Sequence, residues 1–239
     1  MNSYQPAAVL FDMDGTLVDS EKLWDIALSE LAAQYGGILS PTARRAMVGT
    51  SMAESMTILH ADLNQPWRDL QASAAWIEQR MAELFVTDLC WRPGARQLLR
   101  AIRQAGIPTA LVTSTSRALV EVALDTLGRD SFDVVICGDE VSAPKPDPTP
   151  YLTAARRLAV PIRRCVAIED SPAGVTSARR AGALVLAVPS EVPVPPAPGV
   201  HVRDSLVGVD LGLLSGLLDT TEHVERLTVR TGRGGAAPP

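Results

Sequence analysis

Short apolar runs alternate with stretches of helical periodicity along much of the chain. The apolar runs lie at Ala7–Phe11, Thr109–Val112, Val134–Cys137, Val166–Ile168 and Leu184–Val188. Each run is bounded by polar or turn residues, which is typical of strands buried on both faces of a parallel sheet. Helical patterns lie between the later runs, at Ala95–Gln104, Arg117–Leu127, Pro148–Leu158 and Pro172–Arg180. This alternation predicts an α/β fold built on a doubly wound parallel sheet.

The segment from Glu21 to Leu89 interrupts the alternation, because it carries helical patterns only. We therefore expect an α/β core domain from residues 1–19 and 91–220, with an all-helical cap domain inserted at residues 20–90. The stretch Pro189–Pro198 contains five prolines and predicts an extended connection, followed by a short helix near Leu211–Leu218. Residues 221–239 are rich in polar residues, Gly and Pro, and we expect them to be disordered.

Composition and charge narrow the range of functions. The 239 residues are 46% apolar and 21% charged, which indicates a globular chain. A formal net charge of −5 provides no basic field for nucleic acid or an anionic membrane. Three cysteines that form no close pair suggest reduced thiols, which we expect to be buried. No apolar run is long enough for a membrane span, and we expect a cytoplasmic protein. We also expect the protein to be a monomer.

Polar residues follow four of the predicted strands at the point where each strand ends. Asp12 and Asp14 follow the first, Thr113 and Ser114 the second, Lys145 comes after the third, and Glu169 with Asp170 follows the fourth. Each of these alone has a simple structural explanation, such as a turn, a helix cap or an exposed loop. Because the carboxyl ends of parallel strands meet in one crevice, we expect these residues to form one site.

The chemistry of this predicted site is that of a metal ion and a phosphate. Carboxylate and hydroxyl oxygens without His or Cys suit Mg²⁺, which commonly bridges to phosphate groups. A lysine and a hydroxyl suit phosphate oxygens, and a remaining carboxylate can act as nucleophile or as general acid and base. The sequence therefore predicts a Mg²⁺ cofactor and a small-molecule phosphate ester as ligand.

Four motifs, in this order, resemble the haloacid dehalogenase superfamily with a small helical cap: Phe-Asp-Met-Asp-Gly-Thr-Leu, Leu-Val-Thr-Ser, Pro-Lys-Pro and Ile-Glu-Asp-Ser. The resemblance covers residues 6–220 and implies a Rossmann-like core. It implies that Asp12 is a nucleophile forming an aspartyl-phosphate and that Asp14 is the general acid and base. Thr113, the backbone of Ser114, and Lys145 would hold the phosphoryl group. The metal would be bound by Asp12, the main-chain oxygen of Asp14, Asp170 and Glu169.

Within the superfamily, the motifs resemble those of β-phosphoglucomutases and of small sugar- or polyol-phosphate phosphatases. The mutases carry a cap histidine and a Lys and Arg pair around a cap glycine, where this sequence has Trp24, Val48 and Met52. Our leading prediction is thus a Mg²⁺-dependent phosphatase for a small phosphorylated sugar, polyol or similar metabolite. A sugar phosphomutase and a non-enzymatic interaction protein on the same fold are the alternatives.

The resemblance also makes cap residues candidates for contact with the alcohol part of the substrate. Trp24-Asp25 and Gly49-Thr50 are the candidates, although Trp24 could equally pack inside the cap. For Arg44-Arg45, the pair of adjacent charges favours a solvated helix face over a substrate contact.

Overall fold

The structure, a computed structural model, describes residues 5–218. It contains a six-stranded parallel sheet in the order β3-β2-β1-β4-β5-β6. The strands are β1 Ala8–Phe11, β2 Thr109–Val112, β3 Val134–Ile136, β4 Cys165–Glu169, β5 Leu184–Ala187 and β6 Val200–Val202. Around them lie α1 Glu21–Gln34, α2 Pro41–Met47, α3 Met52–Asp62, α4 Leu70–Asp88, α5 Ala95–Gln104, α6 Arg117–Leu127, α7 Thr149–Arg157 and α8 Pro172–Ala181. Short 3₁₀ turns occur at Arg129–Ser131, Gly138–Glu140 and Ile162–Arg164.

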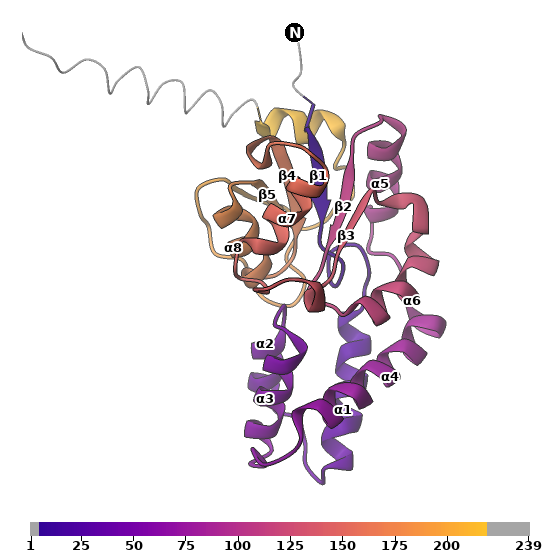
Figure 1. The fold of residues 1–239 in the computed structure, drawn as a ribbon, viewed down its shortest axis with the longest axis vertical. Coiled ribbons are helices and arrows are strands. Elements are labelled where there is room, and N and C mark those ends of the chain that lie inside the picture. The colour runs from indigo at the N-terminus through magenta and orange to yellow at the C-terminus, as the bar shows by residue number, and fades with distance from the viewer. Residues whose placement is uncertain (1–4, 219–239) are drawn as a thin grey trace, which may run out of the picture.

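The predicted fold class is confirmed. Helices cover both faces of the sheet, with α7 and α8 on one side and α5 and α6 on the other (Figure 1). Successive side chains of β1 point to opposite faces of the sheet. Ala8 and Leu10 pack against α7 and α8. Val9 and Phe11 pack against α5 and α6 on the other face. All four side chains are fully buried, which explains why the strand reads as an unbroken apolar run.

Helices α1–α4, which we call the cap, extend from the carboxyl edge of the sheet (Figure 1). The apolar interior of the cap, which includes the fully buried Met56, Leu59, Ile77 and Met81, is continuous with the cluster on the α5 and α6 face of the sheet. Its helices begin at polar caps; Ser40, for example, accepts a hydrogen bond from Ala43 N at 3.1 Å. α4 also contacts α6, so the cap packs against the α/β part of the chain.

The two connections between the cap and the sheet run side by side. Asp19 N donates to Cys90 O at 2.9 Å, and Arg92 N donates to Leu17 O at 2.8 Å. This short antiparallel pairing ties the two ends of the insertion together, at the positions where the sequence predicts the boundaries of the cap.

Two details differ from expectation. β6, at Val200–Val202, is not predicted, because three residues of mixed polarity are too short to stand out as a strand. Cys90 is exposed rather than buried, since it lies at the surface connection after α4, while Cys137 and Cys165 are buried as predicted. The connection at residues 189–198 carries no helix or strand, and residues 211–218 are helical, both as predicted.

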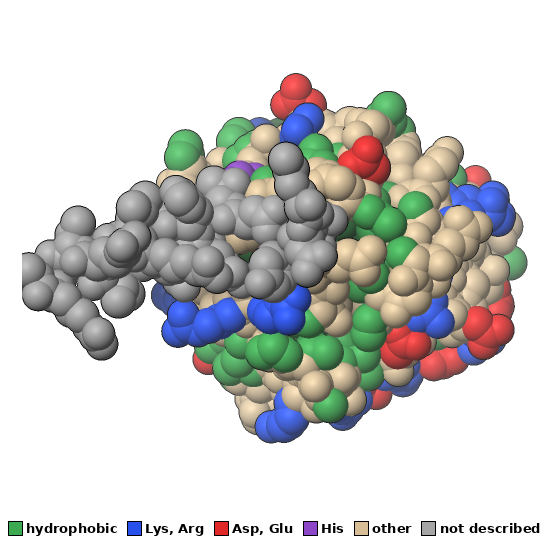
Figure 2. All heavy atoms as spheres, turned by 90° about the horizontal axis from the view of Figure 1, so that it is seen from above, with side chains coloured by type: hydrophobic (Ala, Val, Ile, Leu, Met, Phe, Trp, Pro, Cys, Tyr) green, Lys and Arg blue, Asp and Glu red, His purple; other side chains and the backbone are tan. Residues whose placement is uncertain are grey.

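The surface shows no strong bias of charge where it can be seen. On the end of the molecule away from the cap, basic and acidic side chains are scattered among apolar and other polar ones (Figure 2). Within residues 5–218, no helix has both the length and the apolar composition to cross a bilayer. The predicted disorder of residues 221–239 concerns a segment outside the described residues.

Candidate active site

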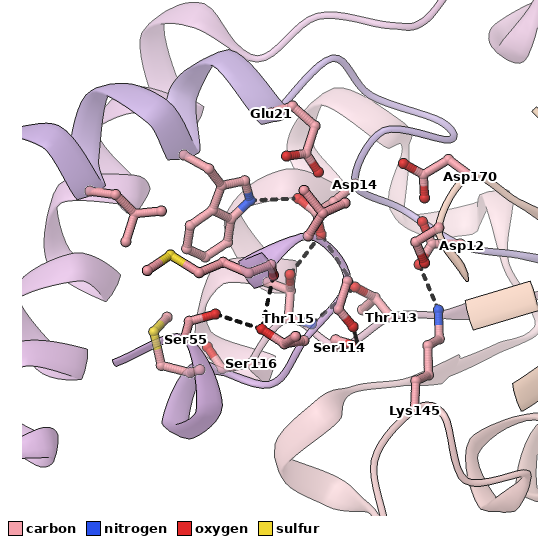
Figure 3. A pocket seen from close by; sticks show the side chains of 18 of the residues that line it. Asp12, Asp14, Glu21, Ser55, Thr113, Ser114, Thr115, Ser116, Lys145 and Asp170 are labelled. Carbon is pink, nitrogen blue, oxygen red and sulfur yellow. Dashed lines mark hydrogen bonds and ion pairs between the residues drawn. The ribbon is translucent and has the colours of Figure 1, made fainter. Parts of the chain in front are cut away.

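The residues predicted at the strand ends meet at one cavity between the sheet and the cap (Figure 3). Asp12 follows β1, Thr113 and Ser114 follow β2, Lys145 lies in the loop before α7, and Asp170 follows β4. Glu169, the last residue of β4, is fully buried and accepts a hydrogen bond from Lys145. The structure thus brings together every core residue that the sequence singled out.

Lys145 is the centre of a buried charge cluster. Its Nζ donates to Asp12 Oδ1 at 2.7 Å, to Glu169 Oε1 at 2.6 Å and to the backbone oxygen of Val112 at 2.9 Å. The Lys145 side chain is only 2% exposed, and all three of its donors are used. A buried ammonium in this geometry holds two carboxylates together and fixes the position of Asp12.

The electrostatics of the cluster favour binding of a further cation. Burial raises the pKa of Asp12 to about 8, despite the opposing effect of Lys145, and Glu169 and Asp14 add to the increase. Burial and the neighbouring Asp12 and Glu169 also raise the pKa of Asp170 well above its usual range. More carboxylates than cations are buried here, and a second positive charge would relieve their repulsion.

The donor set fits a divalent metal ion. Oxygens from Asp12, Glu169 and Asp170 lie within 4.8 Å of one another. Asp12 Oδ2 is buried, yet no described group donates a hydrogen bond to it. A buried carboxylate oxygen without a partner is costly unless a ligand satisfies it. All three residues offer the hard oxygen ligands that Mg²⁺ prefers.

Glu169 is held more tightly than its two acidic neighbours. Besides Lys145, the hydroxyl of Tyr151 donates to Glu169 Oε1 at 2.6 Å. Oε2 accepts from Asp170 N at 3.2 Å and from the Ser171 hydroxyl at 3.2 Å. Tyr151 was not predicted as a site residue, because in the sequence it occupies an ordinary apolar position of helix α7. Because protein donors already occupy both oxygens, Glu169 is better placed to contact a metal ion through water than directly.

Asp14 is surrounded by donors from both the sheet and the cap. Its Oδ1 accepts from the Ser20 hydroxyl at 2.6 Å and from Trp24 Nε1 at 3.2 Å. Its Oδ2 accepts from the Thr115 hydroxyl at 2.7 Å and from Thr113 at 3.4 Å. Ser20 and Thr115 were not predicted as site residues. Their closeness in sequence to Asp14 and Thr113 could have indicated that they belong to the site. The indole contact places Trp24 at the site rather than inside the cap.

Two glycines permit the close packing around this cavity. A Cβ at Gly15, where φ is +73°, would lie 2.1 Å from Asp170 Oδ2. A Cβ at Gly49, where φ is +75°, would lie 2.8 Å from the Ser171 hydroxyl oxygen. Only glycine adopts these conformations easily and leaves that space free. Ser114 Oγ also donates to Gly49 O at 3.5 Å, so the cap loop touches the sheet side of the site.

The cap wall of the cavity combines apolar side chains with one ion pair. Trp24, Val48, Gly49, Thr50 and Met52, all singled out in the sequence, line it. Glu21 and Arg44 line it as well, and neither was predicted to do so. The expectation of a solvated face for Arg44-Arg45 is wrong for Arg44, whose side chain is 15% exposed because it turns toward α1. Arg45 is exposed as expected.

Comparison with known proteins identifies the family of this chain. The family model of haloacid dehalogenase-like hydrolases matches residues 6–182, which contain all four motifs. The chain belongs to this hydrolase family. The predicted resemblance is therefore confirmed.

Several relatives carry named activities. The chain is 34% identical over 176 residues to the phosphorylated carbohydrates phosphatase of Thermotoga maritima, covering 73% of this chain and 81% of that protein. It is 31% identical over 186 residues to the bifunctional riboflavin kinase/FMN phosphatase of Arabidopsis thaliana. That match covers 77% of this chain but 48% of the relative, so the chain spans about half of that protein's length.

The fold is also similar to that of CbbY from Rhodobacter sphaeroides. The structure of CbbY in complex with phosphate has a TM-score of 0.75 and 29% identity, covering 87% of this chain and 99% of that chain. The structure of a CbbY mutant in complex with xylulose-(1,5)bisphosphate has a TM-score of 0.76 and 28% identity, with the same coverage of both chains.

Proposed function

We propose that this enzyme hydrolyses the phosphate monoester of a small sugar, polyol or similar metabolite, in a Mg²⁺-dependent reaction through an aspartyl-phosphate. The observation that carries the proposal is the buried Asp12, held by Lys145 at 2.7 Å, with Oδ2 left without a donor among the described residues. Family membership and the named phosphatase activity of the Thermotoga relative support the same reaction class.

In the first step, a carboxylate oxygen of Asp12 forms a bond to phosphorus, and the bond from phosphorus to the alcohol oxygen breaks. Asp14 supplies the proton that the leaving alcohol requires. In the second step, Asp14 accepts a proton from water, which attacks phosphorus and displaces Asp12. Inorganic phosphate leaves, and both carboxyl groups return to their starting forms.

The other residues of the site position these two groups and balance charge. Lys145 holds Asp12 and lies where it can neutralise negative charge on the transferring group. Thr113 and Ser114, at the end of β2, face the same cavity and can donate to phosphoryl oxygens. We expect Asp12 and Asp170 to hold Mg²⁺, with Glu169 acting through water. When bound, Mg²⁺ would neutralise the charge that builds up on the phosphoryl oxygens.

A mutase is not favoured, because its cap groups are missing from the cavity wall. In the mutases that the motifs resemble, His, Lys and Arg stand where this chain has Trp24, Val48 and Met52. Trp24 cannot do acid-base work, and neither Val48 nor Met52 can bind a second phosphate. A purely structural role on this fold has no support either, since one cavity is lined by Asp12, Asp14, Thr113, Ser114, Lys145 and Asp170.

The direct test is release of inorganic phosphate from a panel of sugar and polyol monophosphates. We expect turnover with Mg²⁺ and its loss in EDTA, with recovery when Mg²⁺ is added back. Binding of Mg²⁺ to the acidic cluster should also raise the Tm of the protein in the absence of substrate. A Tm that does not respond to Mg²⁺, together with equal turnover in EDTA, would refute the metal assignment; no turnover of any ester would refute the reaction itself.

Trp24 is expected to act on both rate and selectivity. Trp24→Phe keeps an apolar wall but removes the hydrogen bond to Asp14, so kcat should fall about tenfold on every ester. Trp24→Ala also removes the wall, and its ranking of substrates should change. Steady-state kinetics across the same panel measures both effects.

Trp67 provides the matched control for these variants. It also belongs to the cap, is 76% exposed and does not line the cavity. Trp67→Ala should therefore keep both the wild-type kcat and the wild-type ranking. If Trp24→Ala behaves like this control, Trp24 has no role in the site.

A further inference from the structure

The cap wall of the cavity carries an ion pair for which the proposed reaction has no use. Arg44, from α2, donates through Nη2 to Glu21 Oε2 at 2.6 Å and to the backbone oxygen of Glu21 at 3.2 Å. Its Nε donates to Asp25 Oδ1. Glu21 and Asp25 both belong to α1, so two carboxylates of one helix share a single guanidinium of the next.

This arrangement makes Arg44 a poor ligand for a second phosphate. Three of its five N–H donors, on Nε and Nη2, are already taken by Glu21 and Asp25, so only Nη1 remains for a ligand. The other cation that lines the cavity within residues 5–218 is Lys145, and its three donors are engaged as well. Glu21 and Arg44 line the cavity with opposite formal charges, whereas Asp25 is 53% exposed and does not line it.

Glu21 retains one acceptor for a ligand. Its side chain is 8% exposed and lines the cavity, and its carboxylate points toward Asp14 (Figure 3). Oε2 accepts from Arg44, whereas no described group donates to Oε1. A carboxylate that lines the cavity and keeps one oxygen without a donor can bind hydroxyl or ammonium groups, and it disfavours anions.

The remaining wall is apolar and adaptable. Leu28, Met47, Met52 and Met56 line it beside Trp24, and methionine side chains can adjust to ligands of different shape. The hydroxyls of Thr50 and Ser55 hydrogen-bond to each other at 2.8 Å. The shape of this wall therefore restricts the choice of the substrate's alcohol part less strictly than the charge of Glu21 does.

We infer that Glu21 determines substrate specificity, by selecting phosphate monoesters whose alcohol part offers a hydroxyl or amine to its carboxylate and carries no second anionic group. The inference rests on the proposed phosphatase function and specifies the substrate class of the same site. It assigns the role to the Glu21 carboxylate, held in place by Arg44, and it makes bisphosphates poor substrates.

The test compares kcat/KM for sorbitol 6-phosphate, glucosamine 6-phosphate and fructose 1,6-bisphosphate. The wild-type enzyme should prefer the better monophosphate over the bisphosphate at least about tenfold, since like charges would meet at Glu21. Glu21→Gln should reduce this ratio at least about fivefold. If glucosamine 6-phosphate loses more than sorbitol 6-phosphate, the group recognised is an ammonium; if both lose equally, it is a hydroxyl.

Two further variants separate charge from structure. Glu21→Asp keeps the negative charge and should keep the preference for monophosphates, even if its rates are lower. Glu30→Gln is the matched control, because Glu30 also lies on α1 and pairs with an arginine, Arg80, at 2.7 Å, but does not line the cavity. Its ratio should equal that of the wild type.

Acetyl phosphate distinguishes a failure of this inference from a failure of the proposed function. Its leaving group is too small to fill the space beside Glu21, so it reports on the phosphoryl site alone. If the wild-type enzyme hydrolyses neither acetyl phosphate nor the panel, the proposed function is wrong. If it hydrolyses acetyl phosphate but favours the bisphosphate, or if Glu21→Gln keeps the wild-type ratio, only the role of Glu21 is refuted.

Discussion

Asp12→Asn is expected to reduce turnover by on the order of 10⁴-fold or more, the scale of loss seen when a catalytic nucleophile is removed. The amide is a poor nucleophile and a weaker metal ligand than the carboxylate. The replacement is nearly isosteric, and Lys145 keeps its bonds to Glu169 and to the Val112 carbonyl. The variant should therefore fold, and the loss should be specific to chemistry.

Asp14→Asn provides the comparison that identifies the nucleophile. With p-nitrophenyl phosphate, whose leaving group needs no proton, this variant should still transfer the phosphoryl group to Asp12. Without a base to activate water, the phosphoenzyme should then accumulate, and intact-protein mass spectrometry after rapid quenching would detect it. Wild-type rates in Asp12→Asn, or a phosphoenzyme in that variant, would show that another residue is the nucleophile.

Lys145→Met is expected to damage both activity and stability. The substitution removes the ammonium that contacts Asp12 and Glu169 and leaves buried carboxylates without their cation. Loss of one partner of a buried ion pair lowers the free energy of unfolding by about 3–5 kcal/mol. Loss of a positive group that stabilises the transferring phosphoryl group should lower kcat about 100- to 1,000-fold.

Urea denaturation followed by circular dichroism, together with kcat at saturating Mg²⁺, would measure the two effects. Lys22→Met is the matched control, because Lys22 pairs with Asp19 at 2.9 Å but is 77% exposed. This exposed pair should contribute little to stability, and its loss should leave kcat unchanged. A Lys145→Met protein as stable and active as this control would mean that Lys145 does not organise the site.

The framework of the protein and the position of its chemistry could be predicted from the sequence. Helices α5 and α6 have the predicted bounds, because their apolar spacing and their following glycines are local signals. The approach of Asp12, Thr113, Lys145 and Asp170 was also predictable, although they lie far apart in the chain. A parallel sheet brings the carboxyl ends of its strands together whatever the intervening sequence is.

The pairing of side chains around these groups could not be predicted, because it depends on how the elements pack in three dimensions. Glu21 and Arg44 lie 23 residues apart on different helices, and Asp14 and Thr115 lie 101 residues apart. In the seven-residue helix α2, adjacent arginines give no periodic signal for which of them turns inward. The spacing of apolar residues along a helix indicates which face of the helix is buried. The position of a buried charged side chain depends instead on the partner that compensates its desolvation. That partner comes from another element, so its identity depends on how α1 and α2 pack against each other and close over the sheet.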